Sequence, residues 1–189
     1  MKKIIEEIVD LPHWYSFGVV FLYSILIAEF FSSVNNLIPI NEPIDNNILI
    51  IFSRIGYVLT VISGFIVWII SALIFHLTAL LFDGSSSFKR FLFVSSCSYI
   101  IPSFLILIGL FMLDKIKFLS SFNSVTDLMG DESVKLVFNL INISALCYYI
   151  VIIIIIHFVY KIKFLHAIFS VAIPILSIWA LIQLFTLIF

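Results

Sequence analysis

Five long apolar stretches restrict the fold of this chain more than any other feature of its sequence. A helix needs roughly 20 predominantly apolar residues to cross the hydrocarbon core of a bilayer. The stretches are Trp14 to Phe31, Ile55 to Phe82, Phe91 to Leu113, Leu136 to Tyr160 and Phe164 to Phe189. Because they lack the alternating pattern of a barrel strand, only helices could span the membrane here. The sequence therefore predicts an all-α transmembrane bundle of about five helices.

The composition supports lipid as the solvent of most of this chain. Of its 189 residues, 63% are hydrophobic and only 11% are charged, whereas soluble domains have about 45–50% and about 25%. A soluble fold of this length could not bury so much apolar surface. The net charge of −1 gives no reason to expect a nucleic-acid partner.

The N-terminal segment differs from the apolar stretches that follow it. In residues 1–13, apolar side chains recur at Ile4, Ile8 and Leu11, with charged residues between them. This spacing is typical of a short amphipathic helix that lies on the membrane surface. We expect residues 14–189 to form one five-helix membrane domain.

The residues before the second span and the distribution of basic residues both bear on topology. We expect Ile48 to Arg54 to form an interfacial or extended lead-in to the second span, with Arg54 reaching the headgroups. Basic residues in short loops mark the cytoplasmic side. One side has Lys2, Lys3, Lys89, Arg90, Lys161 and Lys163; the other has Arg54, Lys115, Lys117 and Lys135 in or beside longer loops. This predicts a cytoplasmic N-terminus and an outside C-terminus. Abundant Ile, Phe and Asn favour a prokaryotic cytoplasmic membrane.

The turn between the second and third spans is the most informative fragment. Asp83 and Gly84 follow the second span, and a glycine there permits the left-handed conformation that ends many helices. Ser86 or Ser87 could cap the next helix. The candidate interaction residues are Asp83, Gly84, Ser85, Phe88, Lys89 and Arg90. They form either a stable helical hairpin or a site for a partner or lipid headgroup, because anionic lipids attract basic side chains.

A second set of candidates lies within the spans. It consists of His76, Tyr99, Pro102, Asn139 and Asn142. His76 precedes Asp83 by seven residues, about 10 Å along a helix, so the pair could relay a proton or hold a cation. Polar and small residues also form stripes along four spans, which indicates either close helix packing or a polar pathway.

The sequence gives no sign of catalysis. No Gly-x-Ser-x-Gly, His-Glu-x-x-His, P-loop or dinucleotide motif occurs. Ser95 to Ser98 have no identifiable base partner, and no histidine or cysteine has the spacing of a metal ligand set. We therefore predict no enzyme activity, no catalytic residue, no cofactor and no metal site.

The motifs resemble the Yip family, the Ypt/Rab-interacting membrane proteins and their prokaryotic relatives. The resemblance lies in His76-x6-Asp83-Gly84, then Ser87-Phe88-Lys89-Arg90 and Tyr99-x-x-Pro102, and in Lys163 to Ile168 before Pro174. It implies five helices, a cytosolic N-terminus and an outward C-terminus. Eukaryotic members act with small GTPases in vesicle traffic. This chain lacks the long cytosolic N-terminal region and the Asp-Leu-Tyr-Gly-Pro type motif of those members, so a GTPase partner is not expected.

These observations predict a non-enzymatic membrane scaffold or partner-binding protein, such as an accessory subunit of an export or membrane-trafficking system. Its expected partners are membrane lipids and another membrane protein or a second copy of itself. The alternative is a small transporter or channel subunit that uses the polar stripes.

Overall fold

The computed structural model describes residues 12–37, 46–119, 122 and 124–188, and all the regular structure in this part is helical. The elements are α2 (His13–Asn35), α3 (Asn46–Leu80), α4 (Phe88–Ser95), the 3₁₀ helix η1 (Ser96–Tyr99), α5 (Ile100–Leu119), α6 (Val125–Gly130), α7 (Glu132–Tyr160) and α8 (Phe164–Ile188). The expected amphipathic helix falls mainly on residues 1–11, which lie outside the described part.

Five helical segments are long and apolar enough to cross a membrane. They are His13–Asn35, Ile50–Leu80, Phe88–Phe118, Glu132–Tyr160 and Phe164–Thr186, the third being α4, η1 and most of α5 in succession. Large apolar side chains such as Ile66, Leu146 and Leu176 are exposed on the outside of the bundle, where lipid is the matching solvent. The predicted class, an all-α integral membrane protein with five spans, is confirmed.

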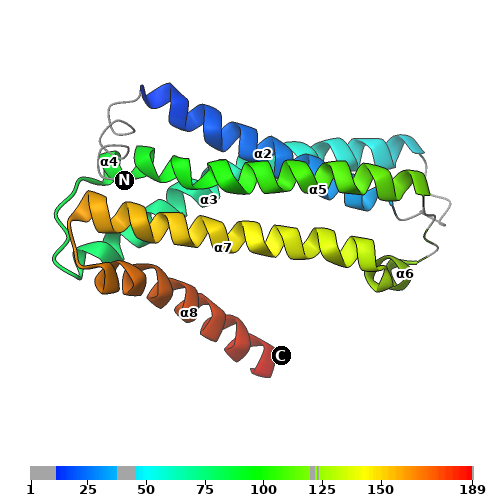
Figure 1. Ribbon diagram of the computed structural model, residues 1–189. Coiled ribbons are helices and arrows are strands. Elements are labelled where there is room, and N and C mark those ends of the chain that lie inside the picture. Colours follow the sequence, from blue (N-terminus) through cyan, green and yellow to red (C-terminus); the bar gives the residue numbers. More distant parts are fainter. Residues whose placement is uncertain (1–11, 38–45, 120–121, 123, 189) are drawn as a thin grey trace.

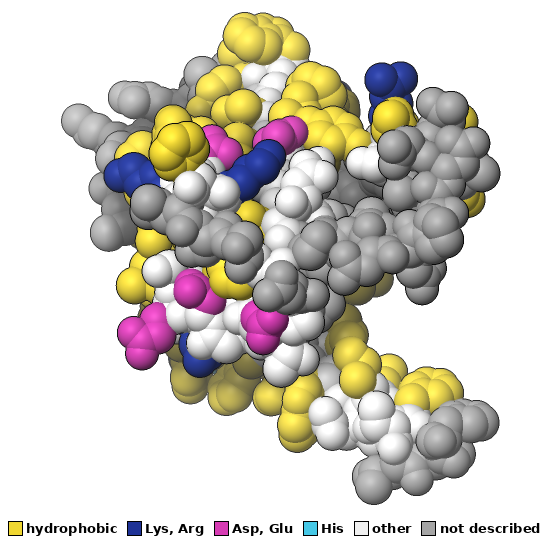
Figure 2. Space-filling model, turned by 90° about the vertical axis from the view of Figure 1, so that its right-hand side faces the viewer, with side chains coloured by type: hydrophobic (Ala, Val, Ile, Leu, Met, Phe, Trp, Pro, Cys, Tyr) yellow, Lys and Arg dark blue, Asp and Glu magenta, His cyan; other side chains and the backbone are white. Residues whose placement is uncertain are grey.

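Successive spans run in opposite directions, side by side (Figure 1). The turns 81–87 and 161–163 lie at one end of the bundle, and α6 lies at the other. Helix α2 starts at the first end and α8 finishes toward the opposite one, diverging from α7 as it goes. Figure 2 views the α6 end, where acidic and basic side chains gather and the last part of α8 stands apart.

The second span corrects the expectation for Ile48 to Arg54. Helix α3 begins at Asn46 and continues without a break to Leu80, so this segment is helical and does not form an extended lead-in. No proline or glycine interrupts it before Gly56, and a helix satisfies its own backbone groups near the hydrocarbon. Helix α2 likewise reaches Asn35, into the expected loop Ser32 to Asn47, whose residues 38–45 are outside the described part.

The third span contains a stretch of 3₁₀ helix directly before Pro102. A proline lacks the N–H that would bond the carbonyl four residues earlier, here that of Ser98, and its ring crowds that carbonyl. The span tightens into η1 at this point. Ser95, Ser96 and Ser98 donate their hydroxyl hydrogens to carbonyls three residues earlier, over 2.7, 2.7 and 2.6 Å. The three serine hydroxyl groups of this irregular segment thus find their hydrogen-bond acceptors within the same span.

Helix α3 packs closely on α2 and α4 near the middle of the bundle. A Cβ added to Gly64 would lie 2.0 Å from Ser24 Oγ and 2.8 Å from Ser24 Cβ, so the two backbones are as close as a glycine permits. One turn further along α3, Trp68 is 1% exposed and its Nε1–H donates to Ser95 Oγ over 3.0 Å. Small residues at such contacts allow membrane helices to approach each other.

Helix α8 is joined to α3 beside its proline. Pro174 lies inside α8 and leaves the carbonyl of Ser170 without its usual helical donor. The Thr78 hydroxyl of α3 donates to this carbonyl over 2.7 Å, and it is also 3.0 Å from the carbonyl of Ile74 in its own helix. A side chain from another span thus supplies the donor that the proline removes.

Replacing Thr78 with valine should weaken this junction. Valine has nearly the same shape but leaves the Ser170 carbonyl without a donor, at a cost of about 1–2 kcal/mol. We expect a lower midpoint of thermal unfolding in detergent. Thr60→Val is the matched control, because the one partner of the Thr60 hydroxyl among the described residues is the Gly56 carbonyl of its own helix. Equal effects of the two substitutions would contradict a role for the α3–α8 bond.

Candidate functional site

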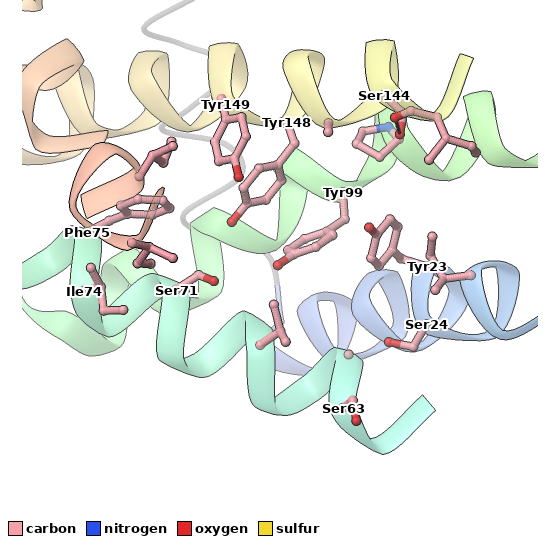
Figure 3. A pocket seen from close by; sticks show the side chains of 18 of the residues that line it. Tyr23, Ser24, Ser63, Ser71, Ile74, Phe75, Tyr99, Ser144, Tyr148 and Tyr149 are labelled. Atoms are coloured by element: carbon pink, nitrogen blue, oxygen red, sulfur yellow. Dashed lines mark hydrogen bonds between the residues drawn. The ribbon is translucent and has the colours of Figure 1, made fainter. Parts of the chain in front are cut away.

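The first candidate site is a cavity of about 410 Å³ inside the bundle. Helices α2, α3, α7 and α8 contribute to its wall, together with η1 and the first turn of α5 (Figure 3). Nine of the twenty lining side chains carry a hydroxyl group: Tyr23, Ser24, Thr60, Ser63, Ser71, Tyr99, Ser144, Tyr148 and Tyr149. None of the twenty is Asp, Glu, Lys, Arg or His. The cavity can therefore form hydrogen bonds, but it offers no charge to an ion and no base to a nucleophile.

A row of four tyrosines forms one wall of this cavity (Figure 3). Ring centroids are 4.7 Å apart between Tyr23 and Tyr99, 4.9 Å between Tyr99 and Tyr148, and 5.3 Å between Tyr148 and Tyr149. The row joins α2, η1 and α7. Aromatic rings packed at these distances stabilise each other, so this wall is well ordered for a ligand.

The structure divides the predicted intramembrane set. Tyr99 and Pro102 line the cavity, whereas His76, Asn139 and Asn142 do not. Both asparagines are exposed on the outside of α7. The predicted polar stripe on the second span does reach the cavity, through Thr60, Ser63, Gly64 and Ser71.

His76 has a different partner from the one considered in the sequence. Its Nδ1 atom shares a hydrogen bond of 2.5 Å with the Tyr160 hydroxyl, at the end of α7. Its ring also lies 5.4 Å from that of Phe88, measured between centroids. Since this bond joins two spans next to the turn 81–87, His76 helps to fix the turn.

A second hollow opens between α2 and α3 toward the α6 end. It has a volume of about 770 Å³, and Asn35, Asn36, Arg54 and Tyr57 are among its lining residues. Thr60 lines both this hollow and the first cavity. The two spaces are therefore neighbours along α3.

The second candidate site is the turn that joins α3 to α4, with its flanking residues. Asp83, Gly84, Ser85, Phe88, Lys89 and Arg90 are here called the basic corner. The Asp83 N–H donates to the Leu80 carbonyl over 3.2 Å, and the Gly84 N–H donates to the Ala79 carbonyl over 3.1 Å. This pair of bonds is a Schellman motif, which ends the helix firmly.

The left-handed residue of this motif is Asp83, with φ 60°, and no described glycine has a positive φ. The expectation that Gly84 would take this conformation is thus wrong. Asp is one of the few residues that tolerates it. Gly84 is instead needed for space, because an added Cβ would lie 2.7 Å from the Ala79 carbonyl oxygen and 2.8 Å from Tyr160 Cδ1.

The rest of the corner is also held in place. The Ser85 N–H donates to the Tyr160 carbonyl over 3.3 Å. Ser87 caps α4 as one of the two predicted serines, accepting from the Arg90 N–H over 3.4 Å. Lys89 and Arg90 follow in the first turn of α4, and both are exposed. The corner is thus a fixed turn that presents two basic side chains outward.

Several residues of these sites carry no motif that distinguishes them in the sequence. Tyr23, Ser144 and Tyr148 belong to apolar stretches of different spans or turns, and only the contacts between spans bring α2 and α7 together around the cavity. The one available signal was the adjacent pair Tyr148 and Tyr149 in the middle of an apolar helix. Among the described residues, no three of the His, Cys, Asp and Glu side chains are grouped so as to hold a metal ion.

Comparison with known proteins gave no relative: no family model, no curated protein and no solved structure matches this chain.

Proposed function

We propose that this integral membrane protein is a non-enzymatic scaffold that binds a partner protein through its basic corner. In this proposal it resembles the Yip family and serves as an accessory subunit of an export or membrane-trafficking system, in a prokaryotic cytoplasmic membrane. The observation that carries the proposal is the asymmetry of charge, among the described residues, between the two ends of the bundle. A small GTPase is not the expected partner.

At the end that holds the corner, the described residues include four exposed basic side chains, Lys89, Arg90, Lys161 and Lys163, and one carboxylate, Asp83. Toward the opposite end lie both signs: Arg54, Lys115, Lys117 and Lys135 with Glu29, Asp114, Asp127, Asp131 and Glu132. Basic residues concentrate on the cytoplasmic side. This supports a cytoplasmic corner and N-terminus, with the C-terminus outside, and it favours an acidic protein surface or anionic headgroups as the bound group.

The basic corner also has a fixed backbone, which favours binding of a partner. Its backbone is fixed by the Schellman motif and by the bond from Ser85 to Tyr160, so little conformational freedom would be lost on binding. The two turns at this end both use a left-handed residue, Asp83 and Lys161. They place the basic side chains of two loops on one end of the bundle.

The double substitution Lys89→Ala and Arg90→Ala tests this function. We expect that proteins recovered with the wild-type chain in mild detergent are lost or strongly reduced, because two of the four basic side chains described at this end are gone. The matched control is Lys115→Ala with Lys117→Ala, which removes the same charge at the other end. The proposal would be contradicted if both double variants recovered the same proteins. It would also be contradicted if the wild-type chain were purified without any partner.

A second candidate function is supported by the hydroxyl-lined cavity. We infer that a transporter or channel subunit built on this space would carry an uncharged molecule, since none of the described residues that line it is charged. Glycerol flux into proteoliposomes should then fall to background for Ser71→Trp, which fills the cavity. Asn142→Leu, outside the cavity, should leave the flux unchanged. Wild-type flux no greater than that of empty liposomes would rule this candidate out.

A further inference from the structure

We infer that the hydroxyl-lined cavity binds the headgroup of an uncharged lipid alcohol, of the monoacylglycerol type, which enters sideways from the bilayer. The cavity volume of about 410 Å³ lies within the range of about 300–1,000 Å³ that is usual for small-molecule sites. The inference rests on the second candidate function only for its cavity, since it names the kind of molecule that this space takes and requires no transport.

The wall of the cavity can both donate and accept hydrogen bonds. The hydroxyl groups of Tyr23, Ser71 and Tyr149 come from three spans (Figure 3) and have no hydrogen-bond partner among the described residues. The hydroxyls of Ser24 and Ser144 donate to carbonyls of their own helices, both over 2.8 Å, so their oxygen lone pairs can still accept. An alcohol group is both donor and acceptor and therefore matches both kinds of hydroxyl, whereas an ester or a ketone can only accept.

The depth of the cavity disfavours a charged headgroup. Ser144 lies about 18 Å from the start of α7, and Tyr148 lies about 18 Å from its end, so this wall is close to the middle of the bilayer. None of the described lining residues is Asp, Glu, Lys, Arg or His. A phosphate or carboxylate there would have no counter-charge, which is costly at this depth. An uncharged glycerol headgroup needs none.

The cavity reaches the lipid-facing surface of the bundle beside α8. Lining residues from three helices are exposed: Val67 of α3 is 56% exposed, Ile178 of α8 is 51% exposed, and Ala145 of α7 is exposed as well. Helix α8 diverges from α7 (Figure 1), and its last part stands apart from the bundle (Figure 2). A lipid can thus keep its acyl chain in the surrounding bilayer while its headgroup occupies the cavity.

Native mass spectrometry of the detergent-purified chain tests the inference with three probes that share one acyl chain. Monoolein has two hydroxyl groups and no charge, methyl oleate is uncharged but has no hydroxyl group, and oleate has a carboxylate. We expect monoolein to form a single, saturable adduct with the chain, and the other two probes to bind at least about tenfold more weakly. Equal binding of all three, or no saturable binding of monoolein, would overturn the inference.

Two pairs of variants locate the bound monoolein. Ala145→Trp places a large side chain at the opening and should abolish binding. Leu146 is 61% exposed beside it but does not line the cavity, so Leu146→Trp should leave binding unchanged. Tyr149→Phe removes only a hydroxyl group and should weaken binding roughly 3- to 10-fold, the effect of one hydrogen bond. Its control is Tyr15→Phe, because Tyr15 does not line the cavity.

If the two variants of either pair bound monoolein equally, the lipid would bind outside the cavity and the inference would be refuted. These outcomes are separable from those of the proposed functions, because binding is measured without flux. A chain that binds monoolein but gives no glycerol flux would refute transport and support the inference. Loss of monoolein binding would leave the basic corner standing, because no corner residue lines the cavity.

Discussion

Gly64→Val is expected to lower the midpoint of thermal unfolding in detergent by about 6–12 °C. The valine Cβ would occupy a position 2.0 Å from Ser24 Oγ and 2.8 Å from Ser24 Cβ. The hydroxyl can rotate away, but Cβ cannot, so α2 and α3 must separate. Overpacking of this kind costs about 3 kcal/mol, which in a chain of this length corresponds to the shift given above.

Gly56→Val is the matched control for this substitution. It lies in the same helix, and nothing lies within 4 Å of an added Cβ. Its effect should therefore be limited to the small difference in helix propensity. The exchange Gly64→Ser with Ser24→Gly should recover much of the stability, because the contact is then one small side chain against one glycine as before. If Gly64→Val were as stable as Gly56→Val, the close approach of α2 and α3 would be wrong.

Gly84→Ala is expected to disrupt the basic corner, at a cost of about 2–3 kcal/mol. The added methyl group would lie 2.7 Å from the Ala79 carbonyl oxygen, which is backbone and cannot move aside, and 2.8 Å from Tyr160 Cδ1. The turn must open to remove this steric overlap, and the opening weakens the hydrogen bond from the Ser85 N–H to the Tyr160 carbonyl. The midpoint of unfolding should fall, and partner recovery should fall with it.

Gly130→Ala serves as the control for Gly84→Ala, since an added Cβ at Gly130 meets no atom of the described residues within 4 Å. His76→Phe gives an independent check on the same region. It removes the bond to the Tyr160 hydroxyl but adds no atoms to the turn, so it should cost less than Gly84→Ala. If Gly84→Ala had normal stability and normal partner recovery, the turn would not be held by the close contacts of Gly84 with Ala79 and Tyr160.

The spans could be predicted from the sequence because their signal is carried by long runs of residues. Each of the five is recovered, with differences of a few residues at most ends. The larger differences between the predicted and the observed structure arise where two features of the local sequence favour different conformations. Ile48 to Arg54 is helical although Arg54 interrupts its apolar run, since a charged side chain that reaches the headgroups does not end a helix. The left-handed turn falls on Asp83, and Gly84 is needed instead because little space is left beside Ala79 and Tyr160.

The sites could be predicted only in part. Lys89, Arg90 and the capping Ser87 lie next to each other in the sequence, and the turn between two spans positions them. The cavity depends on contacts between distant residues: Tyr23 and Tyr99 belong to different spans, and so do His76 and Tyr160. Sequence spacing says which residues share a face of one helix, but not which helix that face meets. For this reason the sequence places Asn139 and Asn142 in one set with Tyr99, although both are exposed on the outside of α7.

Labelling of single cysteines with a membrane-impermeant maleimide tests the central claim most directly, namely a five-span bundle with its basic corner in the cytoplasm. In a chain with Cys97→Ser and Cys147→Ser, Ser85→Cys reports on the corner and Lys115→Cys on the opposite end. We predict that Lys115→Cys and a cysteine added in a C-terminal tag react in intact cells or spheroplasts, and that Ser85→Cys reacts only after permeabilisation. Labelling of Ser85→Cys in intact cells, or a C-terminal tag on the same side as Ser85→Cys, would contradict this account.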